Sequence, residues 1–322
     1  MKRADLANGL LLAGALGASM LAAGSAGGGH TQVRVEQVAP PALPIAEEKA
    51  PDGTAALRDA SGTLAPLRHY ARIASASVVA DHVLDALCEP ERVVAVSTQS
   101  KANARLAFKH GGRRALDSPA ELETILALRP DLLIINHFGD PRFAARLRAH
   151  GIVVFDLGEM HGLSTLLPNI RVIGRLIGAE ERADELAATF QRRIDVVAHD
   201  VAPAQRRRAL YLSAYGKQLF GGARGTSYHD VLVHAGLVDV AGERYEGWPA
   251  LDAEQVLALD PDVLVTKRGM ARALCGAPGL GALRACSGAA RIIELDPELA
   301  DDPGLPMLDA TEQLHDAVYG AR

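Results

Sequence analysis

Two stretches of this chain repeat one another closely, and this repeat restricts the fold more than any other feature. "ELETILALRPDLLI" covers residues 121–134, and "DAEQVLALDPDVLV" covers residues 252–265. Their alignment pairs Glu123 with Glu254 at an offset of 131 residues. Because this offset is close to the size of one compact domain, the repeat predicts two lobes of similar design.

The length and charge of the chain agree with two ordinary globular domains. The chain has 322 residues, which is more than one small hydrophobic core needs. Its net charge is −5, so the basic excess that is typical of nucleic-acid-binding proteins is missing. We therefore expect no nucleic-acid partner.

The N-terminus has the form of a secretory signal. Lys2 and Arg3 precede an apolar stretch over residues 10–23, and small residues suited to a signal-peptidase site end at Ala26. We expect residues 1–26 to be a cleaved signal peptide and the mature protein to be soluble and periplasmic. The alternative is an uncleaved transmembrane anchor. No later run reaches the roughly 18 apolar residues of a membrane-spanning helix.

Short apolar runs bounded by polar residues or Gly alternate with helical stretches along the rest of the chain. Such runs are typical of buried parallel strands. The expected strands cover residues 72–74, 92–97, 131–136, 152–157, 208–214, 262–267 and 291–296, and the helices expected in the first half cover 79–88, 101–109, 119–128 and 140–149. This alternation predicts an α/β fold of two Rossmann-like lobes with mainly parallel sheets.

The boundaries of these parts follow from composition. Residues 27–58 are rich in Pro, Gly and charge and are expected to form a flexible linker. The N-terminal lobe (N-lobe) should cover residues 59–160 and begin with a turn-containing ribbon. A linking helical segment is expected over residues 161–203, and the C-terminal lobe (C-lobe) over residues 204–322.

One long helix is expected to join the lobes. Leu186, Phe190, Ile194 and Val197 are spaced by 4, 4 and 3 residues, which places them in one apolar stripe. No Pro or Gly interrupts residues 179–201, and a helix of this length is a rod of roughly 33 Å. A single rigid helix should limit how far the two lobes can move towards each other.

Ligands of open α/β sheets bind beyond the carboxyl ends of the strands, so we expect a ligand cleft between the lobes. "NHFGD" carries His137 after one N-lobe strand, and "LGEMHG" carries Glu159 and His161 after the next. His137 could ligate a haem or a metal, or cap its own loop. The three side chains together could form a first-row metal site, although such clusters also arise by chance.

The expected C-lobe loops supply apolar and cationic candidates. Tyr215 and Phe220 could form apolar walls of a ligand site. Arg224, Lys267 and Arg268 would suit an anionic chelate or a propionate, and the alternative for each is a solvated surface position. "GGARGTS" lacks the spacing of a phosphate loop, so its glycines are expected to permit a tight turn.

Two histidines and the cysteines have simpler expected roles. We expect His82 to be a structural helix residue and His229 to begin a helix. Cys88 stands in an apolar helical context and is expected to be a buried free thiol. Cys275 and Cys286 bracket a short loop, and in an exported protein they are expected to form a disulfide.

The order and spacing of five segments resemble the substrate-binding proteins of ABC importers for cobalamin, iron-siderophores and haem. The segments are "RDASGTLAPLRHYARIAS", "ELETILALRPDLLI", "GGARGTSYHDVLVHAGL", "GWPALDAEQVLALDPDVLV" and "PGLGALRACSGAARIIELDPELADDPG". They run from about Asp59 to the C-terminus, about four fifths of the chain. The expected linking helix falls where that family has its backbone helix.

The resemblance also implies roles for three residues, Glu123, Glu254 and Trp248. It implies that Glu123 and Glu254 each project from one lobe and meet arginines of a permease dimer in the inner membrane, because carboxylate–Arg pairs give both orientation and energy. The alternative is that both are ordinary glutamates in the first turn of a helix. Trp248 precedes Pro249 at a position where cobalamin-binding relatives stack an aromatic ring, so the resemblance implies that Trp248 contacts the ligand; the alternative is simple packing.

The function implied by the resemblance is capture and delivery of a small molecule. We expect a monomeric, exported substrate-binding protein without an intrinsic cofactor, which binds a metal chelate or tetrapyrrole. Haem, cobalamin and an iron-siderophore all remain open. Residues 97–102 and 115–118 carry no Trp or Tyr to line a cobalamin cleft, and no strongly basic pocket for a carboxylate siderophore is evident.

Two other functions remain open on the same fold. A secreted metal-dependent enzyme would use His137, Glu159 and His161, but no Gly-x-Ser-x-Gly or His-Glu-x-x-His motif supports catalysis. We therefore expect the protein not to be an enzyme. A sensor that has lost transport would keep the ligand cleft and lose the contact with a permease.

Overall fold

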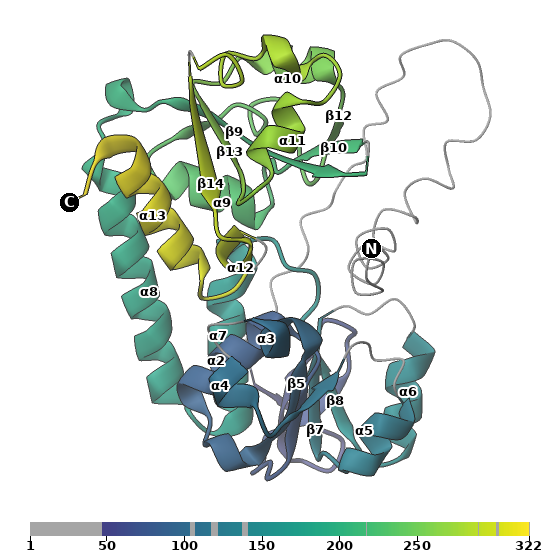
Figure 1. The fold of residues 1–322 in the computed structure, drawn as a ribbon. Coiled ribbons are helices and arrows are strands. Elements are labelled where there is room, and N and C mark those ends of the chain that lie inside the picture. The colour runs from purple at the N-terminus through teal and green to yellow at the C-terminus, as the bar shows by residue number, and fades with distance from the viewer. Residues whose placement is uncertain are drawn as a thin grey trace. The chain divides into compact units, whose positions relative to one another are not determined.

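The computed structural model describes residues 47–103, 107–116, 122–136, 141–216, 218–288, 290–300 and 303–321 (Figure 1). The expected signal peptide and most of the expected linker lie outside these residues, as does His137. No helix in the described part of the chain is long and apolar enough to span a membrane.

A small antiparallel sheet opens the described chain. It consists of β1 (Glu48–Lys49), β2 (Ala55–Arg58) and β3 (Leu64–Pro66), in that order. Ala56 and Leu57 are fully buried, so the expected linker over residues 27–58 extends too far and the N-lobe begins before Asp59. β2 was not predicted because it has only four residues and follows a segment rich in Pro and Gly.

The N-lobe is built on one parallel sheet. The strand order is β6-β5-β4-β7-β8 and every pair is parallel. The strands are β4 (Ile73–Ser75), β5 (Val93–Ser97), β6 (Arg114–Leu116), β7 (Leu132–Ile135) and β8 (Val153–Asp156). The helices are α2 (Val78–Leu87), α3 (Thr98–Ala102), α4 (Ala107–His110), α5 (Leu122–Leu128) and α6 (Pro141–Ala149). Two short helices, α3 and α4, thus replace the single helix expected over residues 101–109.

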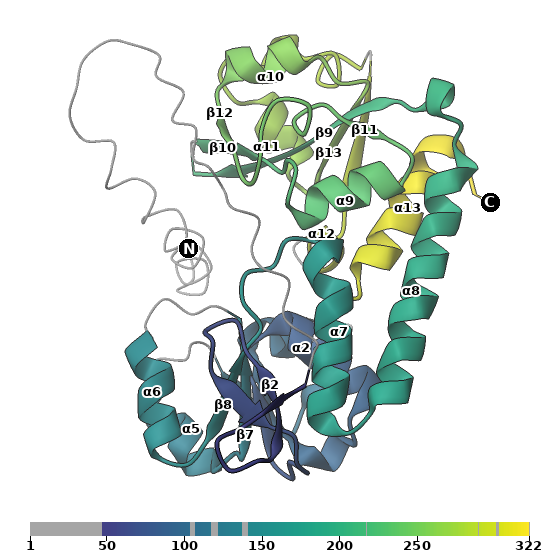
Figure 2. The same cartoon turned by 180° about the vertical axis from the view of Figure 1, so that it is seen from behind.

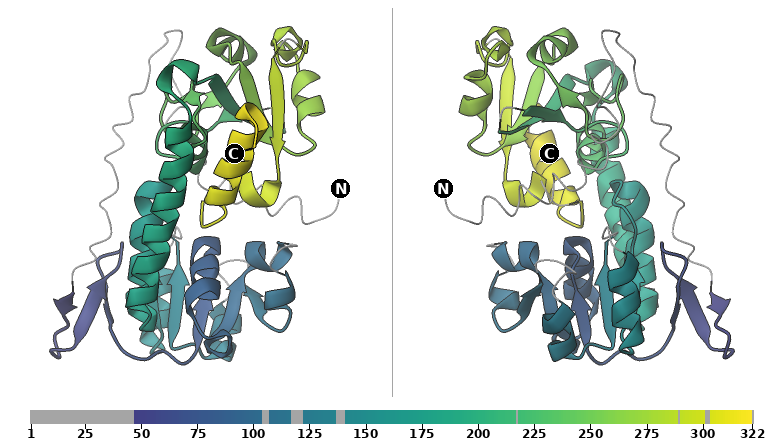
Figure 3. Two further views of the ribbon diagram at one scale, coloured as in Figure 1. Left: turned by 90° about the vertical axis from the view of Figure 1, so that its left-hand side faces the viewer. Right: turned by 90° about the vertical axis from the view of Figure 1, so that its right-hand side faces the viewer.

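The linking segment contains two helices, and the long helix expected over residues 179–201 is the second of them. α7 (Leu163–Ile177) precedes α8 (Glu180–Asp200), and Gly178 makes the turn between them with φ of 76°. A Cβ at Gly174 would lie 2.1 Å from Ala183 Cβ, so glycine lets the two helices approach closely. α7 and α8 lie side by side (Figure 2), and α8 extends alongside both lobes (Figure 3).

The stripe predicted for the linking helix is confirmed on α8. Phe190, Ile194 and Val197 are buried, and Leu186 packs against the same core. This core also includes residues of the N-lobe helix α2 and of the C-terminal helix α13 (Met307–Tyr319). The long helix therefore shares one hydrophobic core with both lobes.

The C-lobe combines parallel and antiparallel strands. The strand order is β12-β10-β9-β13-β14, and β11 also pairs with β9. The strands are β9 (Arg208–Tyr215), β10 (Gln218–Gly221), β11 (Val238–Asp239), β12 (Ala250–Leu251), β13 (Val263–Lys267) and β14 (Arg291–Leu295). The helices are α9 (Ser227–His234), α10 (Ala253–Leu259), α11 (Ala271–Cys275), α12 (Pro297–Ala300) and α13. β13 pairs in parallel with β9 and β14, whereas β10 and β12 are antiparallel.

The sequence repeat is also a repeat of backbone geometry. It covers α5 with β7 in the N-lobe and α10 with β13 in the C-lobe. Arg129 and Asp260 occupy the same place after the helix, and they are the two described non-glycine residues with positive φ, at 47° and 40°. A left-handed residue ends each helix, and the Pro that follows cannot continue it.

The same aspartate then fixes each strand to its neighbour. Asp131 accepts hydrogen bonds from Ala71 N at 2.8 Å and Arg72 N at 2.9 Å. In the C-lobe, Asp262 accepts a hydrogen bond from Arg208 N at 3.2 Å. The predicted pair of similar lobes therefore extends to individual side chains.

Candidate functional site

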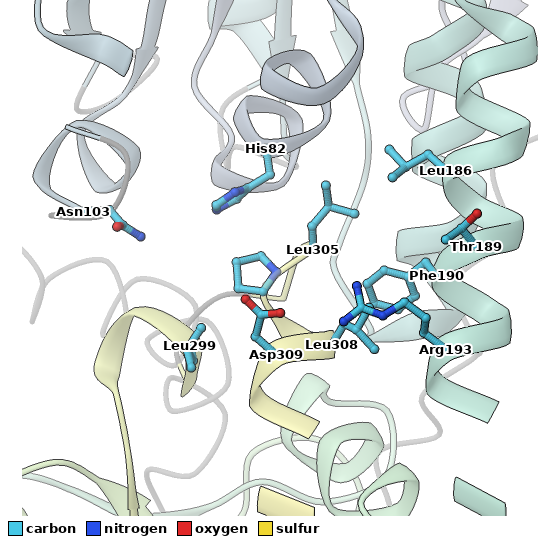
Figure 4. Close-up of a pocket in the computed structure, with 11 residues that line it drawn as sticks. His82, Asn103, Leu186, Thr189, Phe190, Arg193, Leu299, Leu305, Leu308 and Asp309 are labelled. Carbon is cyan, nitrogen blue, oxygen red and sulfur yellow. The ribbon is translucent and has the colours of Figure 1, made fainter. Parts of the chain in front are cut away.

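A pocket of about 340 Å³ lies where both lobes meet the long helix α8 (Figure 4). Its wall comes from α2 and the end of α3 in the N-lobe, from α8, and from the α12–α13 region of the C-lobe. The lining residues are His82, Asn103, Leu186, Thr189, Phe190, Arg193, Leu299, Leu305, Pro306, Leu308 and Asp309. A volume of this size is at the lower end of small-molecule sites, which are about 300–1,000 Å³.

The pocket has apolar walls and a few polar groups. Leu and Phe side chains from α8 and the α12–α13 region supply most of the apolar surface. The His82 ring points from α2 towards the C-terminal segment, with Asn103 to one side and Asp309 opposite (Figure 4). His82 was expected to be purely structural. The structure instead places it in the wall of the pocket, with 9% of its surface exposed.

The elements that hold His82 are fixed by a buried carboxylate. Asp81, the preceding residue on α2, has no exposed surface, and its Oδ2 accepts a hydrogen bond from Ser97 N at 2.8 Å. Burial raises the Asp81 pKa to about 6, against the opposing effect of hydrogen bonds from nearby serines. The bond joins α2 to the end of β5, so the helix that carries His82 is held against the strand that leads to Asn103.

The cation of the pocket is paired. Arg193 Nη2 on α8 donates to both carboxylate oxygens of Glu312 on α13, each at 2.9 Å. The Arg193 side chain is half exposed, at 52%, so the pair contributes little to stability. Its geometry nevertheless orients the guanidinium towards α13.

None of the described residues that the sequence marked as ligand contacts lies in this lining. Phe220 is only 8% exposed, because its strand β10 packs into the C-lobe, and it offers little surface to a ligand. Tyr215, at the end of β9, is 49% exposed. Trp248 is 46% exposed, and its ring meets Tyr228 edge-on at 4.9 Å between centroids. Tyr228 in turn stacks on Tyr211 at 3.7 Å.

Two of the three cationic candidates of the C-lobe, Arg224 and Arg268, form ion pairs on the surface. Arg224 lies 3.3 Å from Glu246, and both side chains are more than half exposed. Arg268 lies 3.0 Å from Asp296 at the end of β14. Lys267 is the last residue of β13 and is partly buried. These contacts leave each side chain near a strand end but outside the pocket wall.

Two of the three proposed metal ligands lie close together. His161 Nε2 is 3.3 Å from Glu159 Oε2. Its Nδ1 is 3.2 Å from the carbonyl oxygen of Gly225. The third, His137, lies outside the described residues, and among those described no group of three His, Cys, Asp or Glu is arranged to hold a metal.

The two repeated glutamates occupy equivalent, exposed places. Glu123 is in the first turn of α5 and Glu254 is in the first turn of α10. On α10, Asp252 accepts a hydrogen bond from Gln255 N at 2.7 Å and completes a capping box. The cap fixes the first turn, and with it the direction of Glu254.

The remaining expectations concern cysteine and histidine. Cys275 and Cys286 are joined by a disulfide with a Cα–Cα distance of 5.3 Å, and Cys88 is a buried free cysteine. His229 lies in the first turn of α9, where its Nδ1 is 2.7 Å from the buried carboxylate of Asp239. This contact is structural and lies outside the pocket lining.

Sequence reasoning missed most of the pocket. Asn103, Thr189, Arg193 and Asp309 were not singled out, and His82 was given another role. His82 and Asn103 follow β4 and β5, so the rule for carboxyl ends of strands could have found them. Thr189 and Arg193 belong to the helix that joins the lobes, and no local pattern marks them as pocket residues.

Comparison with known proteins identifies the family. The family described as periplasmic binding protein matches residues 73–306, well over half of the chain. The chain therefore belongs to the periplasmic binding protein family. Its members and relatives are substrate-binding proteins of transport systems and not enzymes, so the enzyme alternative is not supported.

Individual relatives are similar at a lower level. The ABC transporter substrate-binding lipoprotein YvrC of Bacillus subtilis, an uncharacterised protein, is 23% identical over 212 residues, which are 63% of this chain and 66% of the relative. A vitamin B12-binding protein of Yersinia pestis is 26% identical over 145 residues, 45% of this chain and 51% of that protein. This chain thus spans about half to two thirds of these two relatives.

Solved structures have the same two-lobed α/β fold. A periplasmic haem-binding protein from Pseudomonas aeruginosa is 29% identical to this chain, with a TM-score of 0.64. The match covers 79% of this chain and 94% of that one. The predicted fold class, with two α/β lobes that contain parallel sheets, is confirmed.

Proposed function

We propose that this protein is the substrate-binding component of an ABC importer, that it works outside the cytoplasmic membrane, and that its ligand is haem. The observation that carries the proposal is the pocket around His82, whose wall includes both lobes and α8. A ligand bound there contacts all three parts at once, which is how an importer can distinguish the loaded from the empty protein. The similarity to a haem-binding protein supports the choice of ligand.

The pocket offers the two kinds of contact that an iron porphyrin makes, which are apolar surface and an axial ligand. Leu186, Phe190 and Leu308 supply apolar surface of the kind that packs against a tetrapyrrole. Haem iron takes His, Cys, Met or Tyr as an axial ligand, and His82 is the lining residue of that kind. We assign His82 as the residue that coordinates the iron, with Trp248 and Arg224 as outer contacts from the C-lobe.

Cobalamin is the second candidate ligand, because a similar protein is named as vitamin B12-binding. The pocket lining contains one aromatic residue, Phe190, and neither Trp nor Tyr. A corrin ring would therefore have a single aromatic side chain to stack on there. An anionic siderophore is less favoured, because Arg193, the cation of the pocket, is paired with Glu312.

Haem titration of the purified protein tests the ligand. Trp248 is the single tryptophan of the chain, and haem absorbs light at the wavelengths of tryptophan emission. We expect saturable quenching of Trp248 at one haem per protein, together with a sharpened Soret band. His82→Ala should weaken haem affinity by at least about tenfold. His199→Ala, which alters a surface histidine of α8, is the matched control. Saturable binding of cyanocobalamin without binding of haem would reject haem as the ligand.

Delivery to the permease is proposed to use Glu123 and Glu254. Both are exposed and belong to equivalent helices, one in each lobe, so they could meet equivalent arginines of a two-fold symmetric permease. The Glu123→Ala/Glu254→Ala double variant should keep its haem affinity but lose stimulation of permease ATPase activity in liposomes. The control replaces two exposed glutamates of α8, Glu181 and Glu185. Full stimulation by the docking variant would favour the sensor function.

A further inference from the structure

The start of α7, in the linking segment, is capped by a residue of the C-lobe. The N-cap residue of α7 is Gly162, which has no side chain to cap the helix. Instead, Asp230 on α9 of the C-lobe accepts a hydrogen bond from Leu163 N at 2.6 Å through its Oδ2. A carboxylate at a helix N-terminus satisfies a free N–H group and interacts favourably with the helix dipole. Asp230 therefore does for α7 what an N-cap residue of its own would do.

The fit at this contact depends on glycine. A Cβ at position 162 would lie 2.1 Å from Asp230 Oδ2 and 3.2 Å from the carbonyl oxygen of Thr226. Gly162 also has φ of 65°, a conformation that costs other residues free energy. Both observations indicate that the chain is shaped here to bring the start of α7 into direct contact with α9 of the C-lobe.

His161 makes a second contact across the same junction. The Gly225 carbonyl can only accept a hydrogen bond, so His161 Nδ1 must donate over the 3.2 Å between them. The other ring nitrogen, Nε2, is 3.3 Å from Glu159 Oε2. The backbone N–H of His161 donates to Thr165 Oγ1 at 2.8 Å, which fixes the residue against α7.

The loop that contains Gly225 is joined to the loop that carries Trp248. Ala223 N donates to Gly247 O at 3.0 Å, and Gly247 N donates to Arg224 O at 2.8 Å. Trp248 therefore follows directly on a segment that is hydrogen-bonded to residues 223–224. The Trp248 ring also rests on Tyr228 of α9, two residues before Asp230.

We infer that His161 and Asp230 form a clasp that joins the start of α7 to the C-lobe and thereby positions the Trp248 loop. The inference rests on the proposed function in one respect, because it treats Trp248 as a ligand contact. His161 and Asp230 are positioning residues. They act on the ligand through the backbone of residues 223–225 and through α9, and neither needs to touch the ligand.

Two measurements on His161→Ala and Asp230→Ala test the clasp. The first is acrylamide quenching of Trp248 in the ligand-free protein, which should increase because the loop is less restrained. The second is the haem dissociation rate, which should rise about 3- to 10-fold, as expected for loss of one hydrogen bond, while the association rate stays within about twofold. His161→Gln keeps an N–H donor and should restore most of the effect, and His199→Ala is the control.

The outcomes separate the clasp from the ligand assignment. A lower melting temperature with unchanged Trp248 quenching would show a merely structural contact and overturn the inference. Unchanged quenching with unchanged stability would overturn it as well. If the wild-type protein binds no haem, the proposed ligand fails, but the quenching measurement still tests the clasp. If Asp230→Ala does not fold, Asp230→Asn keeps one acceptor oxygen and should show a smaller increase in quenching.

Discussion

The N-lobe and C-lobe are alike along the repeated unit and different beyond it. In both lobes a short helix ends in a left-handed residue, and an aspartate then binds the backbone at the start of the neighbouring strand. Outside the unit, the N-lobe sheet is wholly parallel, whereas the C-lobe adds the antiparallel pair β10–β12 and a disulfide.

The repeated units and the pocket lie in different parts of each lobe. The repeated units present Glu123 and Glu254 on exposed first turns, and none of their residues lines the pocket. The pocket comes instead from segments that differ between the lobes. The exposed first turns are therefore common to the two lobes, whereas the pocket is specific to the segments in which the lobes differ.

The largest expected effect compares two equivalent core residues of the repeat. Ile125 and Val256 are both fully buried. Ile125→Ala should lower the free energy of unfolding by about 2–5 kcal/mol, and Val256→Ala by somewhat less, about 1.5–3 kcal/mol, because fewer carbons are removed. Urea unfolding of both variants measures this. A larger loss for Val256→Ala would show that the two units are not packed equivalently.

The disulfide tests a feature specific to the C-lobe. Cys275 and Cys286 close a loop with a sequence separation of 11 residues, and the Cys275→Ser/Cys286→Ser variant should lose about 2–3 kcal/mol of stability. Added reductant should destabilise the wild type by a similar amount and leave this variant unchanged. Equal stability of the oxidised wild type and the variant would contradict the prediction.

The pH dependence of stability tests the buried Asp81, which lies on the N-lobe side of the pocket. Burial raises its pKa from 3.8 to about 6, so the folded protein holds this proton more tightly than the unfolded chain does. Stability should therefore fall as pH rises through this range, by at most about 3 kcal/mol. Asp81→Asn should remove that fall and be more stable than wild type at pH 7. Chemical unfolding between pH 4 and pH 7 measures it, and parallel curves for the two proteins would refute the assignment.

The smallest expected effect compares the two strand-fixing aspartates. Asp131 accepts from two backbone N–H groups, whereas Asp262 accepts from one and also binds the guanidinium of Arg284 at 2.9 Å. Asn offers a single acceptor oxygen, so Asp131→Asn gives up one of two backbone hydrogen bonds and should cost about 1 kcal/mol. Asp262→Asn can keep its one backbone bond and loses an exposed ion pair with Arg284, so it should cost less. Thermal unfolding should rank them in this order, and the reverse order would contradict the comparison.

Sequence patterns predicted the architecture well because the fold depends on local signals. Strand runs such as residues 132–135 and 263–267 are short, apolar and bounded by polar residues or Pro, and each forms a buried strand. The apolar stripe at Phe190, Ile194 and Val197 likewise marks the buried face of α8. These features depend on the spacing of apolar residues along a short stretch of chain, and this spacing can be read directly from the sequence.

The candidate site was harder to predict because it depends on tertiary contacts. His82 and Asp309 are far apart in the sequence, and only the packing of α2 opposite α13 brings them to one pocket. Phe220 looked like a site residue because it is aromatic and lies near a strand end, but β10 turns it into the core. The helix expected over residues 179–201 begins directly after Gly178, as α8 does, whereas α7 before that glycine was not predicted as a separate helix.

Hydrogen–deuterium exchange of the protein with and without haem tests the central claim, that the ligand is held by the segments in which the lobes differ. On haem binding we expect added protection from exchange in α2, in residues 186–193 of α8 and in residues 303–309, with no change in α5 and α10. Protection concentrated in α5 and α10 would contradict this claim. Equal protection of both lobes without a change at α2 would contradict it as well.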